Sequence, residues 1–255
     1  TIRAHSTAEV HVSDFQNFEE GLISFLANAK MSGDLFINKG HVNGLARILS
    51  SIKTVENHKI YEAVEIVFQD TNSLQNFGRF LAAKLMSLCI QIVNNFEFMR
   101  SKGSFDWDGL TFENTNKLAS QNAKIRGGTF QNNGTWGVVN QLRATLNKFI
   151  NAGEAHVGSL IAEKIGYLRN EGKLDIDGLC RGIIETLLNN NHTQIDGHAN
   201  LQGNSFANNK SFKVDRDADL NFSESFANMG EIHTQGNFNL RTQRFDQSKD
   251  AKLTA

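Results

Sequence analysis

One stretch near the C-terminus decides the fold. It reads Phe226-Ala227-Asn228-Met229-Gly230-Glu231-Ile232-His233-Thr234-Gln235-Gly236-Asn237-Phe238-Asn239-Leu240. An apolar-x-Asn tripeptide is followed, two residues on, by a Gly, and apolar residues then alternate at Ile232, Phe238 and Leu240. Alternation with a period of two is typical of a strand with one buried face. The stretch therefore predicts a turn, a short strand, a corner at the small residue Gly236, and a second strand.

The same tripeptide recurs along the whole chain. It starts at Phe15-Gln16-Asn17, returns in steps of 18 to 21 residues, most of them 19, and ends in a decayed Phe245-Asp246-Gln247. Near-equal spacing of this kind is the signature of a repeat architecture. After Asn17, the repeated asparagines are Asn38, Asn57, Asn76, Asn95, Asn114, Asn132, Asn151, Asn170, Asn189, Asn208 and Asn228.

Stacked repeats of turn, strand, corner and strand predict an all-β fold, a parallel β-helix (β-solenoid) of about 13 coils with a repeat of about 19 residues. Coils about 4.8 Å apart would form a rod of roughly 60 Å. The chain contains 0 Pro, which fits because Pro cannot donate to a strand ladder. We expect the repeated apolar residues to form an internal column, and the asparagines to form a structural amide ladder. Gly two residues after the Asn is expected at positive φ.

The solenoid is predicted to span residues 21–247. Residues 1–20 fit the repeat poorly and are interpreted as an irregular first coil or a truncated entry, and residues 248–255 as a truncated last coil. Four apolar stretches also fit short amphipathic helices, because short apolar runs are ambiguous: Leu45–Ile52, Ala82–Ile92, Asn140–Ile150 and Leu179–Leu188. Helices there would indicate a repeat scaffold for protein–protein interaction.

The composition excludes several classes of function. Lys and Arg number 26 and Asp and Glu 27, a net charge of −1, which argues against binding to nucleic acid or to an anionic membrane. No apolar run approaches the length of a membrane span. The chain begins at Thr1 without an initiator Met or a signal-peptide pattern, so we expect a piece of a longer protein.

The strongest candidate for chemistry is a column of carboxylates. Asp177, Asp196 and Asp215 each lie seven residues after a repeated Asn, so they should stack on one face about 4.8 Å apart. Such a column could hold Ca²⁺ or supply a general acid and base. It is the basis of an alternative function, a β-helix polysaccharide lyase or hydrolase acting on acidic polysaccharide. The simpler interpretation is a solvated face.

No other residues form a chemical motif. The eight His show no metal-ligand spacing. Cys89 and Cys180 are interpreted as small core residues rather than nucleophiles. Trp107 is interpreted as a buried residue between surface Asp106 and Asp108. The sequence thus predicts no catalytic residue, no cofactor and no metal.

The repeat pattern of apolar-x-Asn-x-Gly, followed by alternating apolar positions around a Gly, resembles the haemagglutinin-type repeats of large secreted bacterial exoproteins. These are the filamentous-haemagglutinin-like adhesins of two-partner secretion and the stalks of contact-dependent inhibition proteins. Residues 226–240 are the best match, and the resemblance covers about residues 15–247. The family's secretion domain carries Asn-Pro motifs that this Pro-free chain lacks, so the resemblance implies a stalk.

That resemblance also implies a function and a location. We expect a right-handed β-helix, secreted or on the bacterial cell surface, exported through an outer-membrane transporter. The implied role is structural and adhesive, and connected with virulence: the segment presents a binding or toxic tip. The implied partners are a host or neighbouring cell surface, through a glycan or protein receptor.

Overall fold

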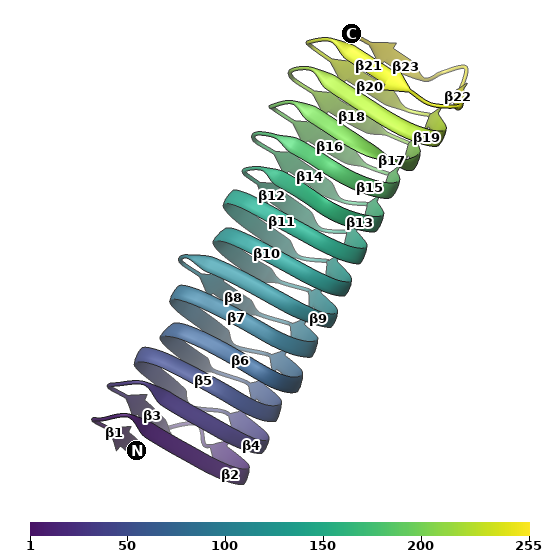
Figure 1. The fold of residues 1–255 in the computed structure, drawn as a ribbon. Helices are drawn as coiled ribbons and strands as arrows, with labels where there is room; N and C mark the ends of the chain where they lie inside the picture. The colour runs from purple at the N-terminus through teal and green to yellow at the C-terminus, as the bar shows by residue number, and fades with distance from the viewer. The chain divides into compact units, whose positions relative to one another are not determined.

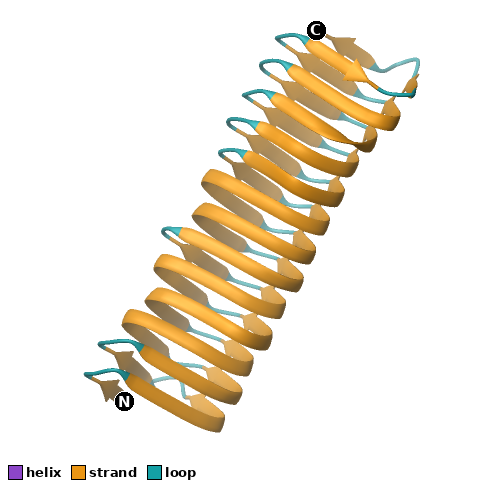
Figure 2. Ribbon diagram, in the orientation of Figure 1, coloured by secondary structure: helices purple, strands orange, loops and turns teal.

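The computed structural model describes residues 1–255 and is all-β (Figures 1 and 2). It is a parallel β-solenoid of about 13 turns with a repeat of about 19 residues, which confirms the predicted fold class. It contains no helix that could span a membrane. The chain divides into two compact units, Thr1–Lys124 and Ile125–Ala255.

The first unit alternates longer strands with short ones, and in its middle turns the two merge into strands of 17 residues. Its strands are β1 (Ile2–Ala4), β2 (Ala8–Asn17), β3 (Leu22–Phe25), β4 (Ala29–Asn38), β5 (His41–Asn57), β6 (Ile60–Asn76), β7 (Arg79–Asn95), β8 (Phe98–Ser101), β9 (Ser104–Asn114) and the start of β10 (Lys117–Asn132). Residues 1–20 form β1 and β2, which pair in parallel with β3 and β4.

The second unit shows the alternation more regularly, with strands of four residues between strands of 10 or 11 residues. After the end of β10, its strands are β11 (Thr135–Asn151), β12 (Glu154–Val157), β13 (Leu160–Asn170), β14 (Lys173–Ile176), β15 (Cys180–Asn189), β16 (His192–Ile195), β17 (Ala199–Asn208), β18 (Ser211–Val214), β19 (Ala218–Asn228), β20 (Glu231–Thr234), β21 (Phe238–Arg241), β22 (Arg244–Gln247) and β23 (Lys252–Thr254).

The helical interpretation of the four apolar stretches is wrong. All four are strand in the structure, within β5, β7, β11 and β15, apart from Leu179, which precedes β15. In β11, Leu142, Ala144 and Leu146 are buried while Arg143 and Asn147 are exposed. The alternation of buried and exposed residues therefore predicts these segments correctly, and the helical spacing does not. In the stacked turns, each strand completes its backbone hydrogen bonds with the strands on either side.

The register aligns each repeated Asn with the next. Asn38 pairs with Asn57 in the first unit, and Asn170 with Asn189 in the second. The decayed tripeptide keeps this register, since Gln247 pairs with Asn228. Successive turns therefore bring equivalent residues into columns.

The apolar residue of each tripeptide forms such a column inside each unit, as predicted. It contains Phe36, Val55, Leu74, Val93 and Phe112 in the first unit, and Phe130, Phe149, Leu168, Leu187, Phe206 and Phe226 in the second, all buried. Adjacent aromatic residues of the column contact one another. The rings of Phe206 and Phe226 stack, with centroids 4.5 Å apart at an interplanar angle of 18°, and those of Phe130 and Phe149 meet edge to face at 5.9 Å. Each added turn therefore buries apolar area against its neighbour.

The turn glycines occur where predicted, but the expected reason for them is wrong. Positive φ occurs at Gly33, Gly127 and Gly182, none of which lies in the turn after a repeated Asn. The turn glycines are instead stacked backbone on backbone. A Cβ on Gly172 would lie 1.9 Å from the carbonyl oxygen of Gly153, and a Cβ on Gly153 would lie 2.0 Å from that of Gly134. Close approach, rather than a left-handed conformation, selects glycine here.

We predict that Gly172→Ala destabilises the fold by about 1–3 kcal/mol, because the methyl group forces packed backbone apart. The matched control is Gly137→Ala in β11, where an added Cβ meets nothing within 4 Å. Denaturant unfolding of both variants measures the difference in the free energy of unfolding. Equal stability of the two variants would contradict the close-approach explanation.

Candidate functional site

The repeated asparagines form an amide ladder in each unit, as the sequence predicts. In the first unit the Nδ2 of each Asn donates to the Oδ1 of the next, from Asn17 to Asn114, over 2.7–2.8 Å. In the second unit the ladder runs from Asn132 to Asn228 over 2.8–3.0 Å. The ladder side chains from Asn38 to Asn228 are at most 1% exposed.

Each amide also binds the backbone of the next turn. The Nδ2 of Asn38 donates to the carbonyl of Ile60 at 2.8 Å, and that of Asn151 to the carbonyl of Lys173 at 2.9 Å. A side-chain amide carries two N–H donors and a carbonyl acceptor. The ladder uses both donors and the acceptor, so the buried polar group costs little to bury. The ladder therefore has a structural role, because each Asn side chain joins its own coil to the next coil of the solenoid.

We predict that Asn151→Ala lowers the free energy of unfolding by about 1–3 kcal/mol for each partner left unpaired in the ladder. The control is Asn147→Ala, on the same strand β11, whose exposed side chain makes no hydrogen bond. Denaturant melts of both variants test the ladder. Several ladder variants as stable as the control would show that the amides contribute no net stability.

The three predicted carboxylates do stack on one corner of the second unit. The backbone N–H of Asp196 donates to Ile176 and that of Asp215 to Ile195, one turn below in each case. Asp177 takes the same position on the preceding turn, with its N–H donating to Val157.

Neighbouring polar side chains contact each of these carboxylates. His156 Nε2 lies 3.0 Å from an oxygen of Asp177. Gln194 Nε2 donates to Asp196 at 3.1 Å and to Asp215 at 3.0 Å. No group of three or more His, Cys, Asp or Glu side chains comes together in a way that could hold a metal ion. The column is thus a surface corner where His156 contacts Asp177, and Gln194 bridges Asp196 and Asp215.

The two cysteines have opposite environments. Cys180 is buried, as predicted, and burial raises the pKa of its thiol to about 12. Cys89 is exposed, so its assignment to the core is wrong. Its neighbours Leu88 and Ile90 are buried, and alternation along β7 turns the residue between them outward. Trp107 is buried, as predicted, and its Nε1 donates to the carbonyl of Ile90.

We predict that iodoacetamide at pH 8 modifies Cys89 and leaves Cys180 unmodified in the folded protein. The thiolate is the form that reacts with iodoacetamide. At pH 8 almost none of Cys180 is thiolate, because burial raises the pKa of its thiol to about 12, and the buried side chain is also inaccessible to the reagent. Peptide mass spectrometry after a short reaction reads out both sites, and unfolded protein labelled at both is the control. Equal labelling of both cysteines in the folded state would contradict this placement.

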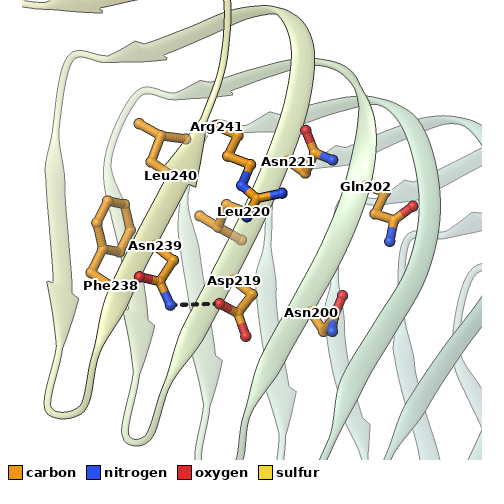
Figure 3. Close-up of a pocket in the computed structure, with 9 residues that line it drawn as sticks. All are labelled: Asn200, Gln202, Asp219, Leu220, Asn221, Phe238, Asn239, Leu240 and Arg241. Atoms are coloured by element: carbon orange, nitrogen blue, oxygen red, sulfur yellow. Dashed lines mark hydrogen bonds between the residues drawn. The ribbon is translucent and has the colours of Figure 1, made fainter.

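The structure also contains an open groove that sequence reasoning missed. It has a volume of about 640 Å³ and lies over β17, β19 and β21 of the second unit (Figure 3). Its polar lining consists of Asn200, Gln202, Asp219, Asn221, Asn239 and Arg241. The alternating residues Leu220, Phe238 and Leu240 also contribute to it, with their side chains on the other face of the sheet (Figure 3).

Register arranges the polar residues of this groove in two columns. One column is Asn200, Asp219 and Asn239, and the other is Gln202, Asn221 and Arg241. Asn239 Nδ2 donates to Asp219 at 2.7 Å. The side chains of Asn200, Gln202, Asn221 and Arg241 make no hydrogen bond or ion pair within the protein. A signal was present in the sequence: polar residues repeat at equivalent outward positions of three successive turns.

A second groove, of about 510 Å³, lies on the first unit over β5 to β8. Its charged lining is Glu62, Arg79, Arg100 and Lys102, and Leu45, Leu81 and Phe98 add apolar surface. His41 Nε2 is 2.8 Å from the carboxylate of Glu62, and the Lys117 ammonium lies over the Phe98 ring. With Glu62 paired to His41, the remaining charged side chains of this groove are the cations Arg79, Arg100 and Lys102. The polar lining of the first groove is, in contrast, mostly uncharged.

Comparison with known protein families, with curated proteins and with solved structures finds no match.

Proposed function

We propose that the chain is a structural and adhesive stalk segment of a large secreted or surface-exposed bacterial exoprotein. In this role it holds a binding or toxic tip away from the cell and binds host or neighbouring surfaces along its sides. The observation that carries the proposal is the unbroken amide ladder of each unit, joined by turns of nearly constant length.

The ladder supports a mechanical role because it leaves no weak turn within a unit. From Asn17 to Asn114 and from Asn132 to Asn228, each turn is held to the next by parallel backbone pairing, by an apolar column and by a buried amide. Such stability is a sum of nearest-neighbour terms, so turns can be added without a new core. This additivity suits a spacer, because coils can be added or removed to change its length while the remaining coils keep the same structure.

The small size of the connections supports the same role. The turn between β13 and β14 contains Glu171 and Gly172, and that between β15 and β16 contains Asn190 and Asn191. Loops of a scaffold commonly carry catalytic residues, and these connections are too short to build a cleft. The hydrogen-bonded carboxylates of the Asp177 corner fit a solvated face of a stalk better than an acid–base pair.

The location is tested with antibodies raised against the folded chain. We expect them to stain intact cells of the organism that makes the protein, or to detect it in the medium, because a stalk works outside the cell. Brief treatment of intact cells with protease should remove the cell-bound signal. An antibody against a cytoplasmic protein serves as the control for cell integrity. Staining that appears only after permeabilisation would contradict the proposed function.

A further inference from the structure

The groove over β17, β19 and β21 carries an inference that deepens the proposed adhesive role and rests on it. We propose that this groove binds an uncharged oligosaccharide, held by hydrogen bonds from Asn200, Gln202, Asn221 and Arg241 to its hydroxyl groups. The adhesive contact of the second unit is thereby assigned to one face, three strands wide (Figure 3).

The residues at the outward positions of this face are unusual for a strand. Asn and Asp are depleted in β-strands, yet they occupy four of the six outward positions of this face. The positions that precede the first column in register hold Arg143, Ile161 and Arg181, and the position that precedes Gln202 holds Ile183. The change to small polar residues begins at β17. Residues that break a local preference without a structural gain are expected at functional sites.

The hydrogen-bond donors and acceptors of four of these side chains are free and aligned. The side chains of Asn200, Gln202, Asn221 and Arg241 project to one side of the sheet and have no partner in the protein (Figure 3). Neighbouring strands lie about 4.8 Å apart, and alternate residues of a strand about 6.6 Å apart, so the groups form a regular grid. The buried ladder asparagines, in contrast, use all their hydrogen-bonding groups within the protein.

The chemistry of the grid selects the ligand. Each amide offers donors and an acceptor, and a sugar hydroxyl can satisfy both kinds of group at once. Phe238 and Leu240 occupy the inward positions of β21 and are half-buried, whereas all six outward positions of the groove hold polar side chains (Figure 3). The carboxylate of Asp219 and the guanidinium of Arg241 balance in charge, which favours a neutral ligand over an acidic or basic one.

The dimensions fit a short oligosaccharide. A volume of about 640 Å³ lies within the usual range for ligand sites, about 300–1,000 Å³. Three strands span about 10 Å across the sheet. Because an extended hexose chain repeats at close to the spacing between strands, successive sugar units can meet successive strands. The groove therefore has room for two or three units, each facing one outward pair of side chains.

The test begins with the whole chain on an immobilised panel of neutral, acidic and amino-sugar oligosaccharides, followed by calorimetry with the strongest neutral ligand. The groove variant is Asn200→Ala with Asn221→Ala. The matched control is Asn140→Ala with Asn147→Ala, which removes two exposed, unbonded amides of the same unit from β11. We expect the groove variant to weaken binding about tenfold or more, since two ligand hydrogen bonds are lost, and the control to leave it within about twofold.

Thermal melts establish that both double variants fold like the parent chain. The proposal is overturned if no neutral oligosaccharide binds, if only acidic ones bind, or if the groove variant and the control bind equally. These outcomes can be distinguished from a failure of the proposed stalk function. Surface staining with unchanged glycan binding in the groove variant overturns the groove alone. Loss of glycan binding in that variant, with staining only inside cells, supports the groove and overturns the stalk.

Discussion

The fold depends on the hydrogen bond between one repeated asparagine and the next. A buried amide without partners costs several times what a hydrogen bond contributes, so an Asn in the core is tolerated only where another lies directly above and below. The need to align the asparagines restricts the number of residues in each coil as well as the type of residue at the ladder position. The two additional residues of the first step lie in the loop Phe18–Gly21, and Asn38 still returns to its place above Asn17. The additional residue of the step from Asn208 to Asn228 lies in a bulge within β19, and the amide hydrogen bond is again kept.

Once the amides are in register, the other columns follow. The residue two places before each Asn faces inward, because side chains alternate along a strand, and it becomes part of the apolar column. The residue two places after the Asn enters the turn, where the backbones of Gly153 and Gly172 approach too closely for a Cβ. One repeated interaction thus determines the core and the turn together, and it leaves only the outward positions free to vary.

This division explains what could be predicted from the sequence. The fold class, the ladder, the apolar column and the stacked carboxylates all depend on spacing, and spacing is visible in a single sequence. The burial of Cys89 was wrongly predicted because the long strand β7 leaves its phase ambiguous until Leu88 and Ile90 are placed. The reason for the turn glycines was missed because close approach is a property of two turns together, whereas a positive φ would be a property of one.

The groove was missed for a related reason, and it shows where function enters such a fold. The ladder does not restrict which residues occupy the outward positions, so these residues do not contribute to the repeat pattern in the sequence. The ladder nevertheless aligns them: Asn200, Asp219 and Asn239 lie side by side only because Asn189, Asn208 and Asn228 hold their turns in register. A solenoid can therefore acquire a binding face by substitutions on three successive turns, without a loop and without any change in the core that supports it.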